Sequence, residues 1–186
     1  MHLEFYVDFA SFERFVSELK QELVPILDTY GLMLKPWDFQ SEYEKFIQQR
    51  IACIRKLAEN GDSTENTPML QELAETNHPR LRNELALALS DLREEQAVDV
   101  IVDLIQQRKT LGNRGTLLYA LEPLDYARHK QVLIDQLIGG NYEVSAQCYE
   151  LLENIKAKFS ESERKDLRTE LNEKAELLRK TASLFD

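Results

Sequence analysis

Apolar residues recur at the spacing of an α-helix along almost the whole chain, and no segment alternates over any length as a β-strand does. A first helical stretch is interrupted by Pro25, which should kink the helix or end it. Residues 35–38 have the composition of a connector. A second helix follows, with an apolar face running from Tyr43 to Ala58, and the polar segment 61–67 follows it as a linker. The pattern predicts an all-α protein.

Beyond Thr67 the apolar pattern repeats with a period of 31 to 32 residues. The core-spaced set Leu85, Ala88, Leu89 and Leu92 returns as Leu117, Ala120, Leu121 and Leu124, and again as Cys148, Leu151, Leu152 and Ile155. A period of this length is typical of stacked helical hairpins, each of which buries its apolar face only against its neighbours. We expect three hairpins, which pair residues 67–77 with 78–92, 94–109 with 112–124, and 128–138 with 141–156.

The segment HPRLRNELALALSDL, residues 78–92, has a proline, then an apolar residue followed by arginine, then Ala and Leu at core spacing. It resembles the second helix of a HEAT-type repeat. The pattern returns over residues 113–124, where Asn113 replaces the apolar residue, and it weakens in the third hairpin, where Val144-Ser145 lacks the arginine. The resemblance covers residues 67–156 and implies an architecture rather than a function. Families with this repeat include adaptors, toxin-neutralising immunity proteins, bilin-chromophore lyases and DNA alkylation repair glycosylases.

The repeats predict that the whole chain is one domain, a short right-handed α-solenoid of about three HEAT-like hairpins over residues 67–156. An aromatic-rich helical hairpin over residues 1–60 precedes the repeats, and a C-terminal helix over residues 160–184 follows them. Ser160 and Glu163 form the signature of a capping box at the start of that helix. We expect the helix to cap the last repeat; binding of a partner by its amphipathic stripe is the alternative.

The chain is acidic, with 33 Asp and Glu against 23 Lys and Arg and a formal net charge of −10. The acidity is spread along the sequence, and no basic face or basic cluster beside an apolar stripe is present, which disfavours nucleic acid and membrane surfaces as partners. A negative field favours encounter with a basic protein. Solubility alone is the alternative explanation of the charge.

Residues suited to catalysis are scattered. The three histidines, His2, His78 and His129, lie far apart, and the first two are terminal or at an expected helix start. Cys53 and Cys148 are 95 positions apart and fall on apolar helix faces, where a buried, reduced thiol is expected. We therefore expect no catalytic residues, no metal and no cofactor. The acidic beginning of the sequence lacks the features of a signal peptide, so we expect a cytoplasmic protein.

Two arginines occupy equivalent positions in the repeats. Arg82 and Arg114 lie in the first turns of two second helices, where a cation opposes the helix dipole and should need a carboxylate nearby. Asp103 and Asp135 recur at equivalent positions of two first helices. These four residues predict a ladder of salt bridges between repeats; a pair of arginines facing a ligand is the alternative.

The solvent-facing side of the second helix of each hairpin is the candidate partner-binding site, since these helices line the concave side of the repeats that the chain resembles. The residues between the core positions of these helices are mixed and mostly acidic. The predicted set is Glu84, Leu87, Thr116, Tyr119, Glu122, Gln147, Glu150 and Glu153. Apolar anchors bordered by acids suit a basic protein partner and suit DNA badly. A solvated acidic face is the alternative.

A second candidate surface lies near the N-terminus, where ten of the sixteen aromatic residues fall within the first 46 positions. Phe5, Tyr6, Trp37 and Phe39 lie off the helical stripes and predict an exposed aromatic patch, with burial in the core as the alternative.

These observations favour a non-enzymatic protein-interaction module, in its most concrete form an acidic inhibitor or immunity-type protein. Two alternatives stay open. One is an enzyme of the bilin-lyase kind, with a pocket near Tyr119, Tyr126, Tyr149 and His129. The other is a structural subunit or adaptor of a larger assembly, joined through the aromatic end.

Overall fold

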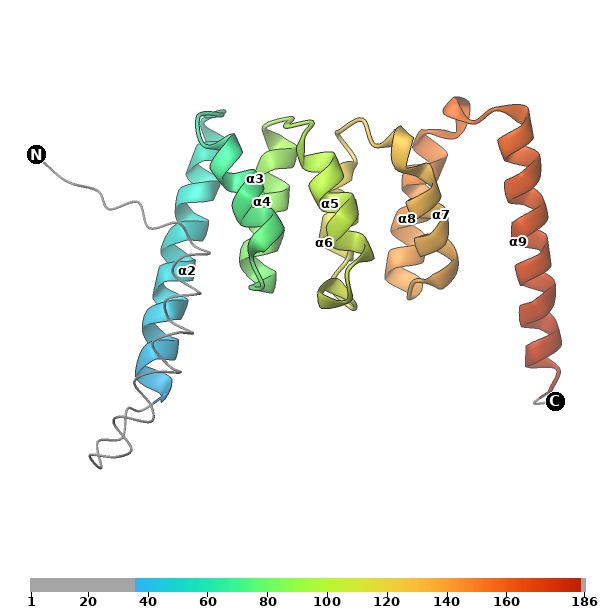
Figure 1. Cartoon of the computed structure of the whole chain (residues 1–186), viewed down its shortest axis with the longest axis horizontal. Coiled ribbons are helices and arrows are strands. Elements are labelled where there is room, and N and C mark those ends of the chain that lie inside the picture. The colour runs from blue at the N-terminus through green and yellow to red at the C-terminus, as the bar shows by residue number, and fades with distance from the viewer. Residues whose placement is uncertain (1–35, 185–186) are drawn as a thin grey trace, which may run out of the picture. The chain divides into compact units, whose positions relative to one another are not determined.

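The computed structural model describes residues 36–184, apart from the side chains of residues 36–42, 178 and 182 (Figure 1). The described residues are helical between short connections and contain no β-strand, which confirms the all-α prediction. In chain order the helices are α2 (Pro36–Glu59), α3 (Asn66–Glu75), α4 (Pro79–Asp91), α5 (Ala97–Gln106), α6 (Gly115–Leu121), α7 (Lys130–Gly139), α8 (Tyr142–Asn154) and α9 (Glu161–Ala182), with short 3₁₀ turns η1 (Arg108–Thr110), η2 (Ala127–His129) and η3 (Lys156–Lys158). None of these helices is long and apolar enough to cross a membrane.

The chain divides into two compact units, unit 1 ending at Asp125 and unit 2 beginning at Tyr126. Unit 1 is a stack of helical hairpins, as the repeats predict. The hairpins α3–α4 and α5–α6 pack on each other, and α2 packs against α4 on the side opposite α6. Helices α2, α4 and α6 thus form one layer, and α3 and α5 form the other. Helix α2 has the place of the second helix of a further hairpin.

The core of unit 1 explains the repeat period. Leu81, Leu85 and Leu89 of α4 are fully buried, and Leu117 and Leu121 of α6, which follow Leu85 and Leu89 by 32 residues, are fully buried as well. Each buried leucine contributes roughly 1.5–3 kcal/mol relative to exposure. Since neither layer can shield these side chains alone, the fold of one hairpin depends on its neighbours.

The start of α2 differs from the predicted connector at residues 35–38. Pro36 begins the helix, because proline has a backbone φ suited to the first turn and lacks one of the N–H groups that the first turn leaves unpaired. The burial of Cys53 is also predicted wrongly. Cys53 is exposed, because the core side of α2 is taken by Ile47, Ile51 and Ile54.

Unit 2 contains the hairpin α7–α8, whose helices pack closely. Its core includes Leu133, Val144 and the fully buried Cys148, and burial raises the pKa of the Cys148 thiol to about 12. Tyr126 is also buried, and its hydroxyl donates to the carbonyl oxygen of Leu151 at 3.0 Å. Cys148 is therefore the buried thiol that its position in the repeat predicts.

The turn between α7 and α8 has room only for glycine at position 140. A Cβ atom added at Gly140 would lie 2.5 Å from the carbonyl oxygen of Gln136 and 2.6 Å from Cγ1 of Val144. The neighbouring Gly139 has open space around it. Close approach of the two helices, rather than an unusual φ, therefore requires glycine at position 140.

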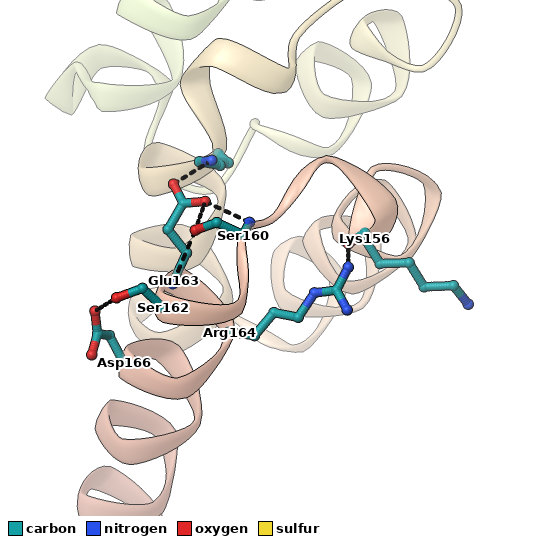
Figure 2. Close-up of polar contacts among 7 residues, drawn as sticks. Lys156, Ser160, Ser162, Glu163, Arg164 and Asp166 are labelled. Carbon is teal, nitrogen blue, oxygen red and sulfur yellow. Dashed lines mark hydrogen bonds and ion pairs between the residues drawn. The ribbon is translucent and has the colours of Figure 1, made fainter.

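Helix α9 begins with the predicted capping box (Figure 2). The Ser160 hydroxyl accepts from the backbone N–H of Glu163 at 3.3 Å, and the Glu163 carboxylate accepts from the N–H of Ser160 at 2.8 Å. The same carboxylate pairs with Lys130 of α7 at 2.5 Å, and the Lys130 ammonium lies 4.9 Å from the centre of the Phe159 ring. These contacts fasten the start of α9 to α7.

The arginines do not form the predicted ladder. Arg82 is fully buried, and none of its guanidinium nitrogens has a hydrogen-bond partner in the part of the chain that the structure describes. Asp103 is exposed on α5, and Asp135, in unit 2, accepts from Gln131. Burial lowers the pKa of Arg82 because it disfavours the charged form.

Arg114 occupies the equivalent position, but its guanidinium has hydrogen-bond acceptors. Its guanidinium donates to the carbonyl oxygen of Gln107 at 3.2 Å and to the hydroxyl of Thr110 at 3.5 Å. These two hydrogen bonds join Arg114 to oxygens of the loop that precedes α6.

The first prediction concerns the α7–α8 turn. Gly140→Ala should lower the free energy of unfolding by about 1–3 kcal/mol, because the added methyl group overlaps a carbonyl oxygen and a valine. Gly139→Ala is the matched control and should be neutral or slightly stabilising, since alanine favours helix. Urea denaturation followed by circular dichroism measures both, and equal effects at the two positions would contradict the close approach.

The second prediction uses the two equivalent arginines. Arg82→Met should raise the free energy of unfolding by about 1–3 kcal/mol, because it removes a buried charged group without partners. Arg114→Met should lower it by about 1–2 kcal/mol, because hydrogen bonds to a charged group are lost. Thermal denaturation at neutral pH measures the change in the free energy of unfolding of each variant, and the two changes should have opposite signs. A loss of stability in both variants would show that Arg82 has a partner in the folded protein.

The third prediction concerns Glu163, whose pKa is lowered to about 2 by Lys130 first and by the N–H and hydroxyl of Ser160 next. A lowered pKa means that this carboxylate stabilises the start of α9 fully above its ordinary range near about 4.3, and that the contribution disappears as the pH falls through about 2. The carboxyl ¹³C shift of Glu163 should therefore stay that of the ionised form down to about pH 3. In Lys130→Met the titration should move upward, and an unchanged midpoint would exclude Lys130 as the main cause.

Candidate interaction surfaces

Five of the predicted partner-binding residues lie together on unit 1. Glu84 and Leu87 are one turn apart on α4, and Thr116 and Tyr119 occupy the equivalent positions of the adjacent α6, which Glu122 follows directly. An Asn83 amide donates to the Thr116 hydroxyl at 3.4 Å and joins the two helices on this side. We call this surface, formed by Glu84, Leu87, Thr116, Tyr119 and Glu122, the α4–α6 face.

The members of the α4–α6 face differ in accessibility. The Tyr119 side chain is 56% exposed and Glu122 is exposed, whereas Glu84, Leu87 and Thr116 are half-buried. Asp91, which the sequence analysis did not include, is exposed at the end of α4, and it lies two turns beyond Glu84. The accessible part of the face is therefore the end that contains Tyr119, Glu122 and Asp91.

The charge of Glu84 is neutralised by a residue that the sequence analysis missed. Arg55 of α2 binds the Glu84 carboxylate through two guanidinium nitrogens, with a 2.8 Å hydrogen bond from Nε. This pairing raises the pKa of Arg55. The separation of 29 residues, close to the repeat period, is a signal that could have indicated the pair, had α2 been aligned with the repeats. The acidic character of the face is consequently confined to the Tyr119 end.

The other three predicted residues belong to unit 2. Gln147 is half-buried, whereas Glu150 and Glu153 are exposed on α8. Glu153 is paired with Lys156, so Glu150 contributes most of the negative charge here. Tyr142 and Tyr149 are 91% and 61% exposed on the same helix. These five residues all belong to α8 and are described within unit 2 alone.

Unit 2 also contains a groove of about 710 Å³ between the end of α8 and the first half of α9. Apolar side chains, including Leu152, Phe159 and Leu167, line it, and Arg164 and Arg168 of α9 lie along it. The guanidinium of Arg164 donates to the carbonyl oxygen of Lys156 at 3.1 Å (Figure 2). The sequence indicated the apolar stripe of α9, but it did not indicate that an open groove would lie between this stripe and α8.

The predicted aromatic patch lies largely outside the described part of the chain. Phe5 and Tyr6 precede it, and Trp37 and Phe39 lie in the first turns of α2, where only the backbone is described. The patch therefore stays a prediction.

Two of the residues weighed for catalysis, His78 and Tyr126, have structural roles. The Nδ1 atom of His78 caps α4 by accepting from the N–H of Leu81 at 3.3 Å. Tyr126, one of three tyrosines considered for the pocket of a bilin-lyase-like enzyme, is buried, and its hydroxyl donates a hydrogen bond to the carbonyl oxygen of Leu151. Within residues 36–184, no three His, Cys, Asp or Glu side chains are placed to hold a metal ion.

Comparison with known proteins agrees with the geometry of unit 1. Residues 44–122 match the family model described as HEAT repeats, a range that starts within α2 and ends directly after α6. No curated protein and no solved structure matches the chain. The match includes α2, in accord with the place of this helix in the layer with α4 and α6. The similarity to HEAT repeats therefore covers residues 44–122 of the 186-residue chain, all of them within unit 1.

Proposed function

We propose that the chain is a non-enzymatic interaction module that binds a basic partner protein on the α4–α6 face. HEAT repeats form helical scaffolds that typically mediate protein–protein interaction. The more specific form of the proposal is an acidic inhibitor of the immunity type, which neutralises a basic protein by covering part of its surface. The observation that carries the proposal is the exposed Tyr119 on α6, with exposed acidic side chains at the ends of the two adjacent helices, Glu122 after α6 and Asp91 at the end of α4.

Tyr119 is the natural anchor of such an interface. Its side chain is 56% exposed on a helix whose Leu117, Leu118, Ala120 and Leu121 are all buried. A tyrosine offers a large contact area and a hydroxyl at little entropic cost, and tyrosine is enriched among the residues that contribute most binding energy. The half-buried Leu87, at the equivalent position of α4, extends the apolar centre.

The acidic residues beside Tyr119 are placed where helix stability does not favour them. Asp91 is the last residue of α4, and Glu122 follows the last residue of α6. The carboxyl end of a helix has a partial negative charge, so an acid there is unfavourable for the helix itself. The two carboxylates and the helix ends favour a negative potential, which Arg93 offsets in part because its guanidinium donates to the carbonyl oxygen of Pro123 at 2.6 Å. The remaining negative field would steer a basic partner toward this end of the face.

The fourth prediction tests this face. The tagged chain should retain a basic protein from the cells that produce it at low salt, and retention should fall as the salt screens the charges. Tyr119→Ala should weaken binding of the recovered protein about 30-fold, because the anchor is removed, and Glu122→Lys should slow association. Calorimetry and stopped-flow mixing with the purified partner measure the two effects.

Tyr142→Ala serves as the control, since Tyr142 is 91% exposed but lies on α8 of unit 2. It should bind the partner as the wild type does. Equal losses in Tyr119→Ala and Tyr142→Ala, or recovery of an acidic partner alone, would remove the α4–α6 face from consideration.

A further inference from the structure

The groove of unit 2 is an apolar surface that the described helices leave open. Its volume is about 710 Å³, and it is lined by Leu137, Tyr149, Leu152, Phe159, Leu167 and Leu171, among others. Only Phe159 of these six is buried, and Tyr149 is 61% exposed. An opening of this size admits several large side chains, in the range of known binding pockets.

The polar contacts described between α9 and the rest of unit 2 lie at the start of this helix. The capping box, the Lys130–Glu163 ion pair and the Arg164 hydrogen bond all lie within its first turns (Figure 2). Beyond them Leu171 and Ala175 are half-buried, and no side chain described for α9 is fully buried. A helix with an apolar stripe that its own unit does not bury is suited to bind another helix.

The charge beside the groove is opposite to that of the chain. Arg164 and Arg168 are one turn apart on α9, and both border the groove. Lys156 also borders it, but Glu153 neutralises this cation. Arg164 donates to a neutral carbonyl, and Arg168 forms no ion pair with any residue that the structure describes. The groove of a chain with net charge −10 is thus bordered by two cations that have no carboxylate partner in the part of the chain that the structure describes.

We propose that this groove binds an amphipathic α-helix of a partner protein, with leucine-like residues on one side and Asp or Glu beside them. The apolar side of that helix would cover Leu152, Phe159 and Leu171, and its carboxylates would pair with Arg164 and Arg168. A helix fits better than an extended segment, because the groove is bordered by helices and the described residues offer no sheet edge. The inference is independent of the α4–α6 face and concerns a partner of opposite charge.

Two synthetic helical peptides test the proposal with the full chain. They share a leucine face at positions i, i+4 and i+7 and differ only in the flanking residues, which are glutamate in one and lysine in the other. Fluorescence anisotropy should show binding of the glutamate peptide about ten-fold tighter than that of the lysine peptide. The net charge of the chain alone would favour the lysine peptide, so the preference reports the groove.

Arg168→Glu should weaken binding of the glutamate peptide about ten-fold, because it reverses an unpaired charge at the groove without removing a structural contact. Lys165→Glu is the matched control: it makes the same charge change on the exposed side of α9 and should leave the affinity within about two-fold of wild type. Leu171→Asp should abolish binding. Circular dichroism verifies that all three variants stay helical.

Three results would overturn the proposal. They are equal affinity for the two peptides, equal effects of Arg168→Glu and Lys165→Glu, and absence of binding at about 1 mM glutamate peptide, the limit of weak association. A second copy of the chain is the alternative occupant of the groove, and sedimentation equilibrium tests for it. A dimer that Leu171→Asp dissociates would assign the groove to that second copy and would overturn the proposal as well.

Discussion

The structure of unit 1 depends on one constraint: no helical hairpin in it can bury its own apolar residues. Leu85 of α4 and Leu117 of α6 lose all exposure because the hairpins stack and because α2 covers the other side of α4. The same constraint makes the ends of the stack important, since a terminal helix has a neighbour on one side only. Burial and exposure in this protein therefore follow from the order of helices in the stack rather than from the composition of any one helix.

The repeat period was sufficient to predict the helical hairpins from the sequence. Core positions 31 or 32 residues apart must occupy equivalent places, and the buried Leu117, Leu121 and Cys148 do so. The capping box at Ser160 was predictable because it is a local interaction with a known sequence signature. The structure of α2 was predicted less well. Pro36 was interpreted as part of a connector, and Cys53 as buried, because α2 was not aligned with the repeats that follow it.

The candidate site could be predicted only in part, because accessibility and charge depend on pairs of residues that the sequence does not place together. Repeat equivalence correctly placed Glu84 and Thr116 on adjacent helices. It did not show that Arg55 binds Glu84, since that pairing requires α2 to pack beside α4. Nor did it show that Arg82 is buried without a hydrogen-bond partner among the described residues, while Arg114 donates hydrogen bonds to its preceding loop. Equivalent apolar core positions such as Leu85 and Leu117 share their burial, whereas the equivalent Arg82 and Arg114 share neither burial nor hydrogen-bond partners.

The two surfaces also show why net charge is a weak guide to the partners of such a protein. Electrostatic interactions are screened over about 8–10 Å at physiological salt, so a docked partner responds to the charges beside its own contact. At the exposed end of the α4–α6 face these charges are Asp91 and Glu122, and beside the groove they are Arg164 and Arg168. The value of −10 describes how the whole chain attracts a distant molecule. Under the two proposals, the local sign of the charges that packing leaves unpaired decides what binds at each surface, so one chain would accept partners of opposite charge.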